Sequence, residues 1–169
     1  MRSPFEQPKP RQVEPGEFPA WDQALALLNR DLAATLPGER PLQLFALRSD
    51  DEAAGREWVH VALANGEWHG NALQPQSVAD PLSALAAVAD AAQETVTERL
   101  WRAWPLCGEH DLGMHPRASD GRLVWWCAGE RPHGGPEHVR AAVGELDSVV
   151  RRARPNRRRR PDRKKRSGR

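Results

Sequence analysis

Cysteine and histidine side chains, the usual zinc ligands in proteins, gather in one short segment of this chain. Cys107 and His110 form a Cys-x-x-His pair, and Cys127 follows them. Two ligands at this spacing on one tight turn can bind the same Zn²⁺, with the sulfur at ~2.3 Å and the nitrogen at ~2.0 Å from the metal. The segment therefore supplies three residues of a candidate zinc site.

The sequence leaves the fourth ligand open between His133 and His138, with His115 as a further choice. Five residues separate Cys127 from His133 and ten separate it from His138, whereas paired zinc ligands in a ribbon are usually about two to four residues apart. Three alternatives to a zinc site stay open. Both cysteines are small buried hydrophobic residues, or they form a Cys107–Cys127 disulfide, or one of them is a reactive thiol.

No residue is predicted to be catalytic. A metal-dependent enzyme would need an open coordination position on the metal and a base beside it, and Glu109 is the nearest carboxylate in sequence. Neither cysteine has the base and orienting group that an activated nucleophile requires at a recognisable spacing.

The last 19 residues form an arginine-rich segment without aromatic residues. Closely spaced guanidinium groups bind phosphates through charge and paired hydrogen bonds, so we expect this tail to contact nucleic acid or an acidic protein. With no aromatic side chain to stack on bases, binding to nucleic acid should ignore sequence. The candidate polyanion-binding residues are Arg151, Arg152, Arg154, Arg157, Arg158, Arg159, Arg160, Arg163, Lys164, Lys165 and Arg166.

Charge is unevenly divided along the chain. The tail has 12 of the 25 Lys and Arg residues and one of the 23 acidic residues, so the remainder is strongly acidic although the net charge is only +2. Two alternatives to polyanion binding follow: the tail folds back onto the acidic body, for which Asp50 to Glu52 is one landing site, or it reflects the arginine codons of a GC-rich gene.

The segment from Trp104 to His110, W-P-x-C-x-x-H, is followed by Asp120-Gly, then by Trp125-Trp-Cys, and finally by Val143-Gly-x-Leu. This pattern resembles small uncharacterised proteins of high-GC actinobacteria and covers about residues 94–147. That family has no established activity, so the resemblance implies a shared C-terminal module and little else. The resemblance also implies that the second histidine is not fixed, which counts against a complete four-ligand site.

Hydrophobic periodicity predicts a soluble α+β fold around these residues. Apolar residues at spacings of three and four predict helices near 20–35, 80–103 and 136–150. Extended runs predict an antiparallel sheet with strands near 42–47, 57–64 and 67–73, and a second hairpin near 112–127 that turns at Asp120-Gly121.

Asn65-Gly66 separates two of these strands and favours a two-residue type I′ turn. Such a turn would pair Leu63 with Trp68 and His60 with Asn71. One face of the hairpin would then be core, and the other would carry polar and aromatic side chains.

Seven tryptophans against three phenylalanines is an unusual ratio. Aromatic residues beside histidines favour a binding surface or a small second core. The candidate interaction residues are Trp58, His60, His69, Trp101, Trp104, Trp125 and Trp126.

The proposed organisation is a disordered, proline-rich segment over 1–17, one domain over 18–150 with its Cys/His segment at 104–138, and a disordered tail over 151–169. Signal-peptide and membrane-spanning patterns are not found, and two cysteines do not make a disulfide framework, so a cytoplasmic location without membrane contact is expected. The favoured function is a non-enzymatic binding or adaptor domain. A chaperone-like or immunity-like protein partner and a metal-dependent enzyme are the alternatives.

Overall fold

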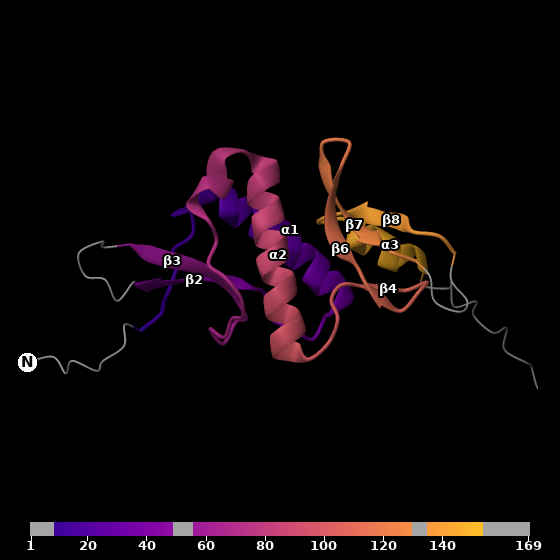
Figure 1. Cartoon of the computed structure of the whole chain (residues 1–169). Helices are drawn as coiled ribbons and strands as arrows, with labels where there is room; N and C mark the ends of the chain where they lie inside the picture. The colour runs from indigo at the N-terminus through magenta and orange to yellow at the C-terminus, as the bar shows by residue number, and fades with distance from the viewer. Residues whose placement is uncertain (1–8, 49–55, 130–134, 154–169) are drawn as a thin grey trace, which may run out of the picture.

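The protein, described here as a computed structural model, is an α+β fold resolved over residues 9–48, 56–129 and 135–153 (Figure 1). None of the helices in these ranges is both long and apolar enough to span a bilayer. The helical elements are α1 (Pro19–Thr35), the short 3₁₀ helix η1 (Pro75–Ala79), α2 (Pro81–Leu100) and α3 (Leu146–Ala153). The strands are β1 (Arg11–Gln12), β2 (Gln43–Arg48), β3 (Glu57–Ala62), β4 (Leu106–Cys107), β5 (Leu112–Gly113), β6 (His115–Ser119), β7 (Arg122–Cys127) and β8 (His138–Ala142).

Helices α1 and α2 confirm the two N-terminal helices predicted from periodicity. The predicted stripe of α1, from Trp21 to Leu32, is buried. Helix α2 begins where Asp80 caps it, because the Asp80 carboxylate accepts a hydrogen bond from the Ser83 backbone amide at 2.9 Å. It ends at Leu100, where the next residue, Trp101, takes a left-handed conformation with φ +53°.

Strands β1, β2 and β3 form an antiparallel sheet, but the predicted strand at 67–73 is wrong: no strand is assigned there. The chain turns through a three-residue loop, because the Leu63 amide donates to the Glu67 carbonyl at 2.8 Å. Only Gly66 has positive φ at this turn, so it is not the type I′ turn that was predicted. After Glu67 the segment runs beside β3, to which it is joined again by a hydrogen bond from the Leu73 amide to the Val59 carbonyl.

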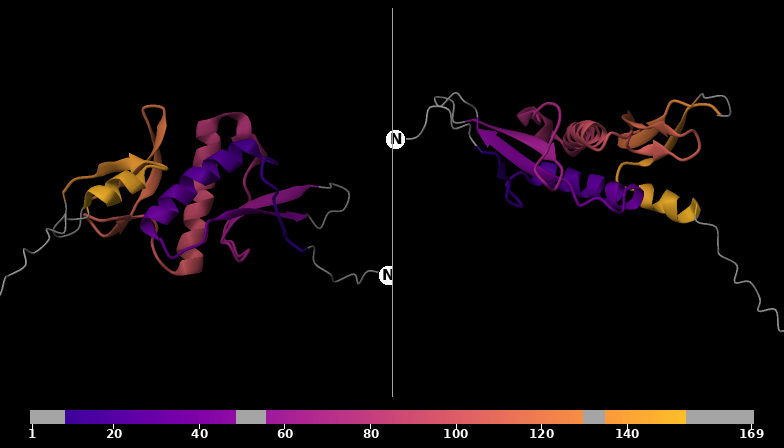
Figure 2. Two further views of the ribbon diagram at one scale, coloured as in Figure 1. Left: turned by 180° about the vertical axis from the view of Figure 1, so that it is seen from behind. Right: turned by 90° about the horizontal axis from the view of Figure 1, so that it is seen from below.

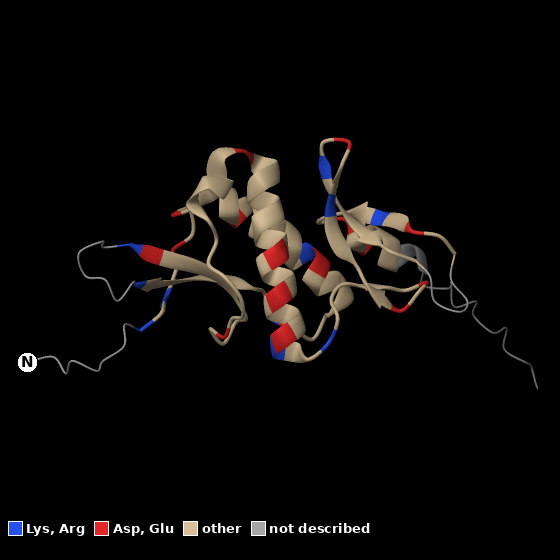
Figure 3. Ribbon diagram, in the orientation of Figure 1, with Lys and Arg blue, Asp and Glu red and all other residues tan. Residues whose placement is uncertain are grey.

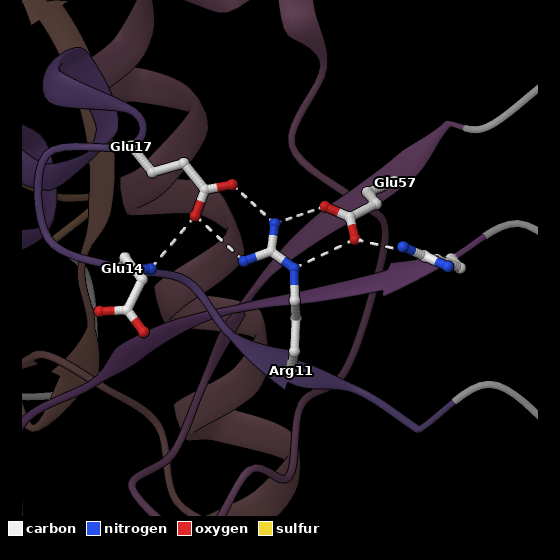
Figure 4. A network of polar contacts seen from close by, with 5 residues as sticks. Arg11, Glu14, Glu17 and Glu57 are labelled. Atoms are coloured by element: carbon white, nitrogen blue, oxygen red, sulfur yellow. Dashed lines mark hydrogen bonds and ion pairs between the residues drawn. The ribbon is translucent and has the colours of Figure 1, made fainter.

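Strand β1 places part of the predicted disordered N-terminus inside the fold. Arg11 pairs with Ala46 of β2, and its guanidinium contacts the carboxylates of Glu17 and Glu57 (Figure 4). The next large apolar residue, Val13, is buried. Residues 9–17 are therefore held by a backbone ladder and ion pairs, while residues 1–8 lie outside the described ranges.

The C-terminal part contains the predicted hairpin, as β6 and β7 with a turn at Asp120-Gly121, but the predicted helix over 136–150 is wrong. Its first half is strand β8, which pairs with β7, and only Leu146–Ala153 is helical. Gly144 separates the two with φ +90°. A side chain there would approach Leu27 to 2.8 Å, so the turn requires glycine.

Helix α2 lies between the two three-stranded sheets, and α1 and α3 cover them from one side (Figure 2). Among the described residues, no α-helix lies over the opposite side of either sheet (Figures 1 and 2). One continuous apolar cluster joins the first sheet, the helices and the inner face of the β6-β7-β8 sheet. Cys107 and Cys127 belong to this cluster, which places the candidate metal ligands at its edge.

Candidate metal centre

The first two candidate ligands lie on a tight turn between β4 and β5. Cys107 is the last residue of β4, and the Asp111 amide donates a hydrogen bond to the Cys107 carbonyl at 2.8 Å. Asp111 has φ +54°, and this conformation closes the turn. His110 therefore lies over the start of its own turn, with its Nδ1 atom 3.6 Å from the Cys107 sulfur.

The other two ligands come from neighbouring strands. Cys127 ends β7 and is paired directly with His138, the first residue of β8. Between them the chain turns sharply at Gly129, whose φ is +68° and where a side chain would lie within 2.6 Å of the Pro136 backbone. Because glycine permits this sharp turn, the chain doubles back. Cys127 and His138 therefore lie side by side, although ten residues separate them in the sequence.

The four ligand atoms lie within 4.8 Å of one another. The Cys107 sulfur is 3.5 Å from His138 Nε2, and the Cys127 sulfur is 3.5 Å from His110 Nδ1. Tetrahedral zinc with bonds of ~2.3 Å to sulfur and ~2.0 Å to nitrogen requires sulfur–nitrogen separations of about 3.5 Å. The three sulfur–nitrogen distances of 3.5, 3.5 and 3.6 Å match this value.

The surroundings of the cluster orient its ligands. The Gly129 amide donates a hydrogen bond to the Cys127 sulfur. The His138 Nδ1 atom is 3.4 Å from the Pro136 carbonyl, which favours the tautomer with a proton on Nδ1 and leaves Nε2 free to bind a metal. Contacts of both kinds are typical of the second layer around protein-bound zinc.

Both cysteines are fully buried and free, so the structure does not show the disulfide considered above. Burial raises the pKa of the Cys127 thiol, and the neighbouring Cys107 raises it further. Without a cation the Cys127 thiol therefore keeps its proton, and a metal must displace that proton when it binds.

Glu109, the base that an enzyme would need, is exposed at the rim of the cluster. Its carboxylate pairs with Arg140 of β8, and one of its oxygens is 3.9 Å from His138 Nε2. The carboxylate is thus held by a cation outside the four-ligand set.

Of the two histidines left open by the sequence, the structure brings His138 into the cluster. His133 falls outside the described ranges. His115 is exposed on β6 and is not one of the four clustered residues.

A buried aspartate of α1 holds the C-terminal part against the rest of the fold, and sequence reasoning missed it. Asp31 accepts hydrogen bonds from the Trp125 indole at 2.7 Å, the Gly144 amide at 2.6 Å and the Leu146 amide at 2.9 Å. Burial raises the pKa of Asp31, and the three donors oppose this shift. The available signal was its position three residues after Leu28, on the buried stripe of the helix.

The predicted interaction residues are dispersed over the fold. Trp104 and Trp125 are buried and contact each other edge-to-face, whereas Trp101 is 88% exposed and Trp126 is half-buried. The His60 ring lies against Trp68, with ring centroids 4.9 Å apart, and its buried Nδ1 atom has no hydrogen-bond partner. His69 is exposed, and Trp58 lies under Arg56 on the first sheet.

The arginine-rich tail begins inside α3. Arg151, Arg152 and Ala153 complete this helix, and the remaining candidate polyanion-binding residues lie outside the described ranges.

Comparisons with protein-family models, with curated proteins and with solved structures find no match to this chain. The resemblance to actinobacterial proteins therefore stays a prediction.

Proposed function

We propose that this chain is a non-enzymatic binding domain with one structural Zn²⁺, and that its arginine-rich tail contacts nucleic acid or another polyanion. The observation that supports the metal is the closed set of four ligand atoms at Cys107, His110, Cys127 and His138. Two sulfurs and two imidazole nitrogens in tetrahedral reach of one point are the donor set that zinc prefers.

A structural role for the metal is favoured over a catalytic one. Catalytic zinc sites keep an open position for water or substrate, whereas four protein ligands fill a tetrahedral shell. Glu109 is paired with Arg140, which leaves it poorly suited to serve as a general base. The metal would instead hold the β4-β5 turn against β7 and β8, from which Cys127 and His138 come.

The tail supplies the binding activity in this proposal. It carries 12 basic residues against one acid, so its attraction for phosphates is strong and independent of sequence. If about six of these charges engage phosphates, log K falls with log[salt] with a slope of roughly −4 to −5. A cytoplasmic location is part of the proposal, because reduced thiols bind zinc.

The test is the binding of a fluorescent oligonucleotide at several salt concentrations. A chain that ends at Ala153 keeps α3 whole and removes 154–169, and a chain lacking residues 1–8 is the matched control. We expect the chain that ends at Ala153 to lose most of the binding and most of its dependence on salt concentration. The control chain should keep both. Equal binding by all three chains at low salt would contradict the role of the tail.

A second candidate function, interaction with a protein partner, is favoured by Trp101. Its side chain is 88% exposed, immediately after α2. Tryptophan is one of the residue types most enriched among the side chains that dominate binding at the centres of protein interfaces. A defined complex that is lost on Trp101→Ala and kept without the tail would select this function.

A further inference from the structure

The β6-β7-β8 sheet has an outer face over which no helix of the described part of the chain lies. Along β7, Leu123, Trp125 and Cys127 belong to the apolar cluster, whereas Val124 is buried but outside it. Since side chains alternate along a strand, Val124 and Trp126 point to the opposite, outer face. The outer face is the side of the sheet away from α1 and α3 (Figure 2).

Three side chains form a row across this outer face. Trp126 is paired with His115 of β6 on one side and with Val139 of β8 on the other. Val139 is 50% exposed and His115 is exposed, so the half-buried indole lies between two accessible neighbours. The row is apolar at its centre.

Arginines stand on the same face. The Arg117 guanidinium lies 5.0 Å from the centroid of the Trp126 ring, and no carboxylate among the described residues pairs with it. Arg122, at the other end of the hairpin, is joined to Glu145 by a pair whose side chains are both more than half exposed. Such an exposed pair is weak and can exchange its carboxylate for a phosphate.

Acidic side chains of α2 border the face beside β6. Asp90 and Glu94 of α2 are exposed, and Asp90 interacts electrostatically with His115. Figure 3 shows acidic positions along α2, basic positions on β6 and β8, and an acidic position beside β8. These acids repel a polyanion along α2, whereas Arg117 attracts one to the face itself.

We infer that this outer face, with Arg117, Trp126 and Val139 at its centre, binds unpaired bases of single-stranded nucleic acid. The inference rests on the proposed function, in which the tail attracts the phosphate backbone. A base stacks on the Arg117 plane or on the indole beneath it, with Val139 against its edge. Bases in a duplex are already stacked on one another, so only a single strand can use this face.

The experiment uses the full chain and a labelled oligothymidylate or oligouridylate of about 20 nucleotides, long enough to span the face and the tail. Two variants alter the face, Arg117→Gln and Val139→Asp. Arg56→Gln is the control for Arg117→Gln, because the Arg56 guanidinium lies 5.4 Å from the Trp58 ring centroid on the other sheet. Val78→Asp is the control for Val139→Asp, because Val78 of η1 is 45% exposed. Thermal melting of all four variants checks that the fold is kept, and Arg117 is exposed enough that its replacement does not touch the core.

We expect each face variant to weaken single-strand binding about fivefold or more, the loss that corresponds to one base stack, and the controls to stay within about twofold of the parent chain. A duplex of the same sequence should not distinguish the variants from their controls. Equal binding by face variants and controls, together with loss of binding when the tail is removed, overturns the inference and leaves the proposed function standing. No binding by the parent chain at low salt overturns both.

Discussion

Replacing Asp31 tests whether the buried carboxylate holds the C-terminal part of the fold in place. Asp31→Ala leaves three buried N–H groups without an acceptor: the Trp125 indole and the Gly144 and Leu146 amides. Each buried donor left unpaired costs about 1–3 kcal/mol, and the three share one cavity that water can partly fill. We therefore expect the free energy of unfolding to fall by about 3–5 kcal/mol.

Asp31→Asn separates the effect of losing hydrogen bonds from the effect of creating a cavity, because asparagine has nearly the same size as aspartate. The amide keeps one accepting oxygen but places an NH₂ group against at least one of the three donors, so a smaller loss of about 1–3 kcal/mol is expected. Asp22→Ala is the control on the same helix, because the Asp22 carboxylate accepts a single hydrogen bond, from the exposed Gly16 amide.

Urea unfolding followed by tryptophan fluorescence measures all three variants at neutral pH. The expected order of destabilisation is Asp31→Ala, then Asp31→Asn, then Asp22→Ala. If Asp31→Ala were no more harmful than Asp22→Ala, the docking of β7 and α3 through Asp31 would be refuted.

Three further predictions follow from the same contacts. Hydrogen bonds from Arg11 lower the pKa of Glu17 and Glu57, so the stability that these bonds add is present above the ordinary glutamate pKa and is lost as pH falls through the lowered values. The difference in unfolding free energy between the parent chain and Arg11→Ala, measured by urea unfolding, should therefore be constant near neutral pH and shrink below about pH 4. An equal shrinkage for the exposed Arg40→Ala would contradict this prediction. Gly144→Ala should cost about 1–3 kcal/mol in the same assay, and more than Gly121→Ala, because both positions have positive φ but only Gly144 meets a neighbour, Leu27 at 2.8 Å. Dialysis against a strong chelator should lower the melting temperature and the near-ultraviolet circular dichroism of the buried tryptophans, with recovery on adding Zn²⁺ but not Mg²⁺; an unchanged signal would mean that no metal supports this part of the fold.

The elements that the sequence predicted well are those whose signals are local. The apolar stripe of α1 and the Asp80-Pro81 start of α2 each specify a helix within a few residues, and both helices are found close to their predicted bounds. The Asp120-Gly121 hairpin is likewise defined by its own turn and two extended runs.

The errors arose where a distant partner decides the structure. Val139, Val143, Leu146 and Val150 fit a helical stripe, but pairing with β7 makes the first of them part of a strand. Gly144, inside that stripe, was the local sign against one continuous helix. The hairpin at Asn65-Gly66 failed for a local reason, because the Leu63–Glu67 hydrogen bond adds a residue to the loop and shifts the register.

The candidate site was predictable in its ligand types and only partly in its membership. Cys107, His110 and Cys127 follow from spacing and from the hairpin between them. The choice of His138 does not, because it depends on the β7–β8 pairing and on the return of the chain at Gly129. The spacing of residues in the sequence therefore did not reveal ligands that are adjacent only because their strands are paired.

The structural zinc site is tested most directly by the metal content of the untagged chain, measured by native mass spectrometry. Cys107→Ala and His138→Ala each remove one of the four clustered ligands, and His115→Ala, an exposed histidine two strands away, is the matched control. We predict one zinc per chain in the parent protein and in His115→Ala, and its loss from both ligand variants together with thermal stability. A metal-free parent chain, or zinc retained in equal amount by all three variants, would contradict the central claim.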